Sequence, residues 1–193
     1  MIAFVVLVLH LLGFCQVHTM GRSAVLLLYP VVYQGFIGTL EEVLFRGILY
    51  RIAAQHLGTL LAAVASASLF AVFQLSNEGA NVTTVLFVVI WGIALAMMFS
   101  LTGRLWFPIF FHAGWNSAMV ILGTLVSGMD DFRRYALLRT EMRGPAWLTG
   151  GSFGPEDSVI ALDLTALPAG ALCAIASKRD RAQVSDGAGA CSL

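Results

Sequence analysis

The chain is a series of long, almost uninterrupted apolar stretches separated by short polar or glycine-containing links. Apolar runs of roughly 20 residues are typical of transmembrane helices, whereas the strands of a membrane barrel alternate apolar and polar positions. Lipid-facing backbone must also satisfy its own hydrogen bonds, which favours helices. The stretches cover residues 2–14, 24–40, 59–75, 82–101, 105–126 and 159–176. The sequence therefore predicts an all-α, polytopic transmembrane bundle of about six helices.

The links indicate where these helices begin and end. The second stretch continues with helical spacing toward His56, and Gly58 is expected to end it before the third begins. The first stretch, residues 2–14, lacks the basic flank and cleavage site of a signal peptide, and it is shorter than the ~20 residues of a full span. We assign residues 1–177 to one transmembrane domain and residues 178–193 to a polar tail that we expect to be disordered.

Composition supports a membrane location. Hydrophobic residues make up 59% of the chain, charged residues only 11%, and the mean hydropathy is +0.85. A soluble domain has about 25% charged residues, so we expect a lipid bilayer to surround this chain. The net charge of zero gives no indication of a nucleic-acid partner. The cysteines are too far apart to predict a disulfide framework or a thiolate metal site: Cys15, Cys173 and Cys191.

Two adjacent glutamates and an arginine follow the second apolar stretch. Ionisable groups within a membrane are costly unless they face a protein or water-filled interior and find partners. Glu42 and Arg46 share a helix face, and we expect the guanidinium to fork the carboxylate with two hydrogen bonds. Glu41 lies ~100° around the helix from Glu42, which leaves it free to face a cavity as a general base. Alternatively, the ion pair only stabilises the helix or an assembly.

Two further pairs of residues share helix faces in later apolar stretches. His112 and Asn116 lie one turn apart, and together they are able to donate two hydrogen bonds to an oxyanion or a substrate carbonyl. Phe70 and Gln74 share a face near the end of the third stretch. Each pair taken alone also fits helix packing or interhelical hydrogen bonding. The combination of carboxylates, a guanidinium and an imidazole–amide pair instead indicates a hydrolytic site.

A metal ion is compatible with this set of residues but is not required by it. Zinc hydrolases usually offer three protein ligands from His, Asp, Glu or Cys. Glu41 and His112 are candidate ligands, and Glu42 would make a third, but the chain has no HExxH motif. The amides of Gln74 and Asn116 are poor zinc ligands. We therefore expect no required cofactor, with zinc as an alternative.

With these residues, the chain resembles the CAAX-protease and bacteriocin-processing family of intramembrane proteases (CPBP, also called Abi). That family is marked by the motifs EExxxR, FxxxH and HxxxN on three separate transmembrane helices. Here the first motif begins at Glu41 and the third begins at His112. The motif-bearing core spans residues 29–126, and the resemblance continues to about residue 176. Residues 147–156 also resemble a loop that precedes the last helix in bacterial members.

The second motif departs from the pattern of the family. Phe70 is present, but Gln74 occupies the position of the family's histidine. In the family, the first glutamate and this histidine are thought to activate the attacking water. A glutamine is able to orient a water but not to carry a proton. The resemblance otherwise implies Glu41 as the base, Glu42 and Arg46 as its structural support, and His112 with Asn116 on the oxyanion side.

The resemblance implies an intramembrane endopeptidase that hydrolyses a peptide bond near the membrane with glutamate-activated water. The expected partners are the lipid bilayer and a peptide or membrane-protein substrate, and the expected location is the bacterial plasma membrane. The alternative is a catalytically impaired relative that binds peptides or proteins, for example in bacteriocin immunity or as a scaffold. A small transporter would require broken helices and repeat symmetry, and the sequence shows neither.

Overall fold

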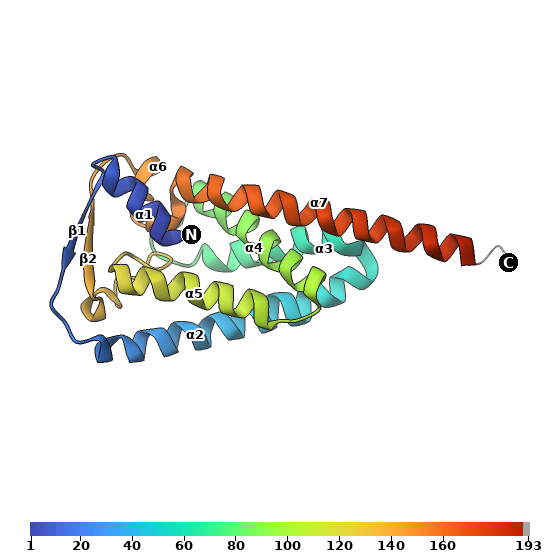
Figure 1. Cartoon of the computed structure of the whole chain (residues 1–193), viewed down its shortest axis with the longest axis horizontal. Helices are drawn as coiled ribbons and strands as arrows, with labels where there is room; N and C mark the ends of the chain where they lie inside the picture. The colour runs from blue at the N-terminus through green and yellow to red at the C-terminus, as the bar shows by residue number, and fades with distance from the viewer. Residues whose placement is uncertain (191–193) are drawn as a thin grey trace.

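In the computed structural model, helices lie side by side along the long axis of the molecule (Figure 1). The structure describes residues 1–190, with side chains up to residue 182. In chain order the α-helices are α1 (Ile2–Leu11), α2 (Leu28–Glu42), α3 (Arg51–Gln74), α4 (Val82–Thr102), α5 (Trp106–Leu122), α6 (Ala146–Thr149) and α7 (Val159–Ala190). This arrangement confirms the predicted all-α bundle, because α6 is a single short turn and the other helices match the apolar stretches.

One helical segment, Ala24–Gln74, carries the first two motifs and is broken at Gly58. The 3-10 turn η1 (Ala24–Leu27) leads into α2, and the π-helical turn η2 (Val43–Tyr50) joins α2 to α3. Gly58 interrupts α3 as predicted, with φ +75° and ψ 172°, a conformation that glycine adopts without steric cost. The chain turns back there, so that the second half of α3 packs against α4 and η2 (Figure 1).

Within the described residues, three helical segments are long and apolar enough to cross a membrane: Ala24–Gln74, Val82–Thr102 and Val159–Ala182. Large apolar side chains cover the outward faces of these helices, and examples include Val32, Phe36, Leu61, Val72 and Leu167. In water, an apolar surface of this extent would promote association, whereas in a bilayer it contacts the acyl chains. The protein is therefore an integral membrane protein.

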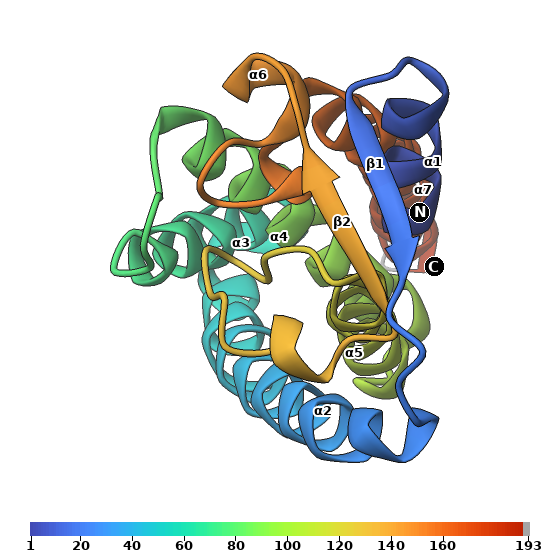
Figure 2. The same ribbon diagram turned by 90° about the vertical axis from the view of Figure 1, so that its left-hand side faces the viewer.

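A small antiparallel sheet closes one end of the bundle, a feature that the sequence did not predict (Figure 2). Strand β1 (Cys15–Thr19) pairs with β2 (Leu138–Met142), and Cys15 lies opposite Met142. Arg22, just after β1, donates hydrogen bonds to the carbonyls of Arg133 and Arg134 at 3.1 and 2.6 Å. The long link between α5 and α7 is therefore folded. It also contains the 3-10 turns η3 (Arg133–Tyr135) and η4 (Pro155–Asp157).

The C-terminal segment differs from the predicted disordered tail, because α7 continues as a helix to Ala190. Arg179 anchors this extension to the end of α4. Its Nη1 donates to the Ser100 carbonyl at 2.8 Å, and its Nη2 donates to the Ser100 hydroxyl at 3.0 Å. Residues 191–193, which include Cys191, lie outside the described part of the chain.

Candidate active site

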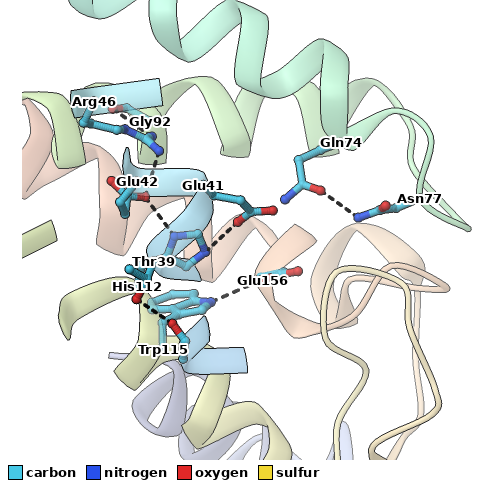
Figure 3. Close-up of polar contacts among 11 residues, drawn as sticks. Thr39, Glu41, Glu42, Arg46, Gln74, Asn77, Gly92, His112, Trp115 and Glu156 are labelled. Carbon is cyan, nitrogen blue, oxygen red and sulfur yellow. Dashed lines mark hydrogen bonds and ion pairs between the residues drawn. The ribbon is translucent and has the colours of Figure 1, made fainter. Parts of the chain in front are cut away.

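The fold brings residues of the three motifs together inside the bundle, and Figure 3 shows Glu41, Glu42, Arg46, Gln74 and His112 among them. They come from different helices that are adjacent in space, because α2 packs against α5, α3 packs against α4, and α4 in turn contacts α5. The residues are Glu41 and Glu42 at the end of α2, Arg46 in η2, Gln74 at the end of α3, and His112 and Asn116 on α5. All except Glu41 are buried, and the side chain of Glu41 is 15% exposed.

The predicted ion pair between Glu42 and Arg46 is present, and both side chains are fully buried. Arg46 Nη1 donates to Glu42 Oε1 at 2.8 Å. The predicted two-bond fork is wrong, because Arg46 Nη2 donates instead to the backbone carbonyl of Gly92 at 3.3 Å. Helix α4 approaches so closely at Gly92 that its carbonyl competes with the second carboxylate oxygen. The guanidinium also lies over the ring of Phe70, 4.8 Å from its centroid.

His112 lies between the two glutamates. Its Nδ1 is 2.9 Å from Glu42 Oε1, and its Nε2 is 3.6 Å from Glu41 Oε2. A carboxylate only accepts hydrogen bonds, so Nδ1 donates to Glu42 and Nε2 is the nitrogen that faces Glu41. Glu41 faces a cavity, as its position on the helix predicts, but it is not isolated there, because α5 places His112 directly beside it.

A cavity of about 170 Å³ lies beside Glu41. Glu41, His112 and Asn116 all line it, and His112 Nε2 lies 3.6 Å from Glu41 Oε2. Gln74 also lines it, and its side-chain oxygen accepts a hydrogen bond from Asn77 Nδ2 at 2.7 Å. The cavity is several times larger than the ~30 Å³ that one water occupies in the liquid. A water and a peptide group therefore have room to meet beside these residues.

Aromatic side chains form an apolar wall behind His112. The rings of Phe70 and Trp91 each lie with centroids 6.2 Å from the imidazole, in edge-to-face arrangements. Trp115 packs against Trp91 with ring centroids 4.6 Å apart. These rings keep water away from one side of the imidazole, which strengthens the electrostatic interactions of His112 with the glutamates.

Sequence reasoning missed several polar residues that reach the site. Gln34 is 1% exposed, its Nε2 has no hydrogen-bond partner, and it lines the cavity with Glu41. Its position seven residues before Glu41 puts both side chains on one helix face, and this spacing could have identified Gln34 as a site residue. Ser127 and Glu156 come from the link before α7, which reaches the site only through tertiary folding. Spacing along the chain contains no signal for such residues.

Gly92 allows the close approach that gives Arg46 its second partner. A Cβ atom there would lie 2.7 Å from Ala67 Cβ and 3.2 Å from Arg46 Nη2. We expect Gly92→Ala to lower the free energy of unfolding by about 1–3 kcal/mol, the usual cost of overpacking. Thermal unfolding in detergent measures the effect. Gly170→Ala is the matched control, because a Cβ at Gly170 meets nothing within 4 Å. Equal melting temperatures for the two variants would contradict the prediction.

Within the described part of the chain, no group of three or more His, Cys, Asp or Glu side chains has an arrangement that could hold a metal ion. Glu41 and His112, the candidate ligands, face each other, with Oε2 and Nε2 3.6 Å apart. Glu42, the third candidate, instead accepts hydrogen bonds from Arg46 and His112, and no chemical step is assigned to a metal here. Cys15 and Cys173 are free thiols.

Comparison with known protein families supports the grouping of these motifs. Residues 21–118 match the family model for the type II CAAX prenyl endopeptidase Rce1-like proteins. The match covers about half of the chain and includes all six predicted site residues. No curated protein and no solved structure gave a match. The chain thus belongs to the type II CAAX prenyl endopeptidase Rce1-like family, a family of CAAX-type intramembrane proteases.

Proposed function

We propose that the protein is an intramembrane endopeptidase in which Glu41 activates a water molecule for attack on a peptide bond. The observation that carries this proposal is the position of Glu41, a partly accessible carboxylate at a cavity that His112 and Asn116 also line. Membership of a CAAX protease family agrees with it. The substrate would be a peptide segment in or next to the membrane, and the location would be the bacterial plasma membrane.

In the proposed reaction Glu41 accepts a proton from water while the water oxygen bonds to the carbonyl carbon. The carbonyl oxygen becomes negatively charged, and the amide of Asn116, which lines the same cavity, donates a hydrogen bond to it. His112 Nε2, which faces Glu41, helps to hold the water and the base in place. The tetrahedral intermediate then collapses, the C–N bond breaks, and the leaving nitrogen takes up a proton. Preorganised donors in a site that excludes bulk water are the largest contribution to this type of catalysis.

Glu42 and Arg46 act on the reaction through His112. The Nδ1 hydrogen bond to Glu42 fixes the orientation of the imidazole, and Arg46 in turn holds Glu42. A buried partner of this kind keeps a histidine in one tautomer and one rotamer, as in other acid–base sites. We therefore assign Glu42 and Arg46 positioning roles, in agreement with the structural support that the family resemblance implies.

A direct test uses the full chain in proteoliposomes with a library of membrane-proximal peptides in water labelled with oxygen-18. Hydrolysis is expected to produce two fragments, with the label in the new carboxylate of the N-terminal fragment. Cleavage that also occurs in empty liposomes or in a Glu41→Ala variant would overturn the proposal. Adding a chelator in the same assay tests metal dependence, and we expect the rate to be unchanged.

The presence of Gln74 supports a second candidate function, in which the protein has lost most of its catalytic activity and binds peptides or proteins. The Gln74 amide is held by Asn77 and has no titratable proton. We expect Gln74→His to increase the cleavage rate by about 10²-fold or more, within the range of acid–base contributions. The control is Asn77→Ala, which frees the Gln74 amide without adding an imidazole. An inactive parent with an active Gln74→His variant would support the impaired relative, whereas equal rates would contradict a catalytic role for position 74.

A further inference from the structure

Two adjacent carboxylates, Glu156 and Asp157, are buried in η4 at the start of the last helix. Each is only 3% exposed, and carboxylates are almost never this buried unless they have partners. Asp157 has a structural explanation, because its Oδ2 accepts hydrogen bonds from Asn81 Nδ2 at 2.7 Å and from Thr84 Oγ1 at 3.1 Å. These contacts tie η4 to the first turn of α4. Glu156 faces the other way, toward α5 and the candidate active site.

Glu156 contacts the helix that carries the third motif. Its Oε2 accepts a hydrogen bond from the indole nitrogen of Trp115 at 3.1 Å, and Trp115 is the residue immediately before Asn116 (Figure 3). The carboxyl also lines a cavity of about 10 Å³ together with Gln74, His112 and Asn116. That volume is close to the ~10–15 Å³ needed for one water. A single water would therefore connect Glu156 to the residues of the site.

The loop before Glu156 holds it in this position. Gly150 and Gly154 both have positive φ, +83° and +119°. A Cβ at Gly150 would overlap the carbonyl of Gly154, and a Cβ at Gly154 would lie 2.9 Å from the carbonyl of Leu125. Asp157, the next residue, is bonded to Asn81 and Thr84, and the Glu156 carboxyl is bonded to Trp115 on α5, so both the backbone after Glu156 and its side chain are held. Such support from packing and hydrogen bonds is what a functional side chain requires.

The proposed reaction leaves one chemical task unassigned, the supply of a proton to the leaving amine, and the amide of Gln74 has no proton to give. We propose that Glu156 is a further proton-exchanging residue of this site, which donates a proton through one water to the leaving amine. This inference rests on the proposed function. As the C–N bond breaks, the water passes a proton to the nitrogen and takes one from Glu156, which becomes a carboxylate. Glu41 releases the proton that it took from the attacking water, and Glu156 regains one, so each turnover consumes one water.

The surroundings of Glu156 suit this exchange near neutral pH. Burial raises its pKa to about 7, while hydrogen bonds from Ser127 and Trp115 and the charge of His112 limit the increase. Asp157, the adjacent carboxylate, points to α4. A proton donor is most effective when its pKa lies near the working pH. An acid must be protonated to act, so the rate is expected to fall as the pH increases above about 7.

The experiment compares the full chain with Glu156→Gln and Asp157→Asn over the pH range on both sides of neutrality. We expect kcat/KM of the parent to fall above about pH 7. Glu156→Gln keeps an acceptor for Trp115, so a purely structural role would leave the profile in place. We expect that variant to be about 10²-fold slower and to lose the decline at high pH. Asp157→Asn, the matched control, is expected to keep the parental profile.

A second readout does not depend on cleavage. Difference infrared spectra of the parent minus Glu156→Gln report the carbonyl stretch of the protonated Glu156 carboxyl as a function of pH. We expect this band to disappear with a midpoint near pH 7, and Glu41→Gln to shift the midpoint because the two groups share one site. Failure of the parent to cleave any peptide would refute the proposed function alone. A missing band, or a parental pH profile in Glu156→Gln, would overturn the role of Glu156.

Discussion

Replacing Glu41 with glutamine is expected to reduce kcat/KM for peptide cleavage by about 10²–10⁴-fold, the range attributed to a general base. The amide has the same size as the carboxylate and would remain at the cavity beside His112. It is unable to accept a proton from water, so the nucleophile would no longer be activated. Removal of this acceptor should lower kcat rather than raise KM, because the proton moves only in the transition state.

The matched control for this experiment is Glu78→Gln. Glu78 is an exposed glutamate in the link between α3 and α4 and does not line the cavity. The same substitution there removes one negative charge without touching the site, so its rate should equal that of the parent. Circular dichroism in detergent checks that both variants are folded. A Glu41→Gln variant with the parental rate would show that another group activates the water.

The largest expected effect on stability comes from removing Glu42. In Glu42→Leu the guanidinium of Arg46 would stay fully buried without its carboxylate, and His112 Nδ1 would also lose its acceptor. Breaking a buried ion pair by removing one partner typically costs 3–5 kcal/mol, since it leaves an uncompensated charge. We expect the free energy of unfolding to decrease by about this amount. Reversible unfolding with sodium dodecyl sulfate in mixed micelles measures it.

A double variant distinguishes the cost of an unpaired buried charge on Arg46 from the cost of lost packing around Glu42. Glu42→Leu combined with Arg46→Leu removes both charges, and apolar replacements of buried ion pairs are often neutral or stabilising. We expect the double variant to be more stable than Glu42→Leu alone and to be inactive, because His112 is no longer oriented. If the double variant is as unstable as the single one, the cost arises from the His112 hydrogen bond or from packing, and the orphaned guanidinium is not its source.

The sequence was most informative where structure depends on neighbours along one helix. The spacing of Glu42 and Arg46 predicted their ion pair, and Gly58 predicted the break in α3, because both follow from local helical geometry. Uninterrupted apolar stretches predicted the helical bundle for the same reason. An apolar stretch does not indicate how far its helix extends beyond the membrane. Helix α7 continues well past residue 177, the predicted end of the transmembrane domain.

Contacts between helices were harder to predict, because they depend on the distance between segments that are remote in the sequence. His112 was placed with Asn116 by its spacing, but its contact with Glu41 required the packing of α5 against α2. The pairing of β1 with β2 joins segments more than 100 residues apart and has no local signal. Glu156 lies in a loop that resembles one in the family, but the sequence does not show that its carboxyl accepts a hydrogen bond from Trp115 on α5.

The turn at Gly58 also determines how deep in the membrane the candidate site lies. A single helix of 51 residues would be ~75 Å long at 1.5 Å per residue, far more than the ~30 Å core of a bilayer. The reversal at Gly58 must therefore lie near one membrane surface. Counting along either arm from that point, Glu41 and Gln74 are each ~25 Å away. A peptide would thus enter from the opposite surface, the side on which the β1–β2 sheet and the Glu156 loop lie.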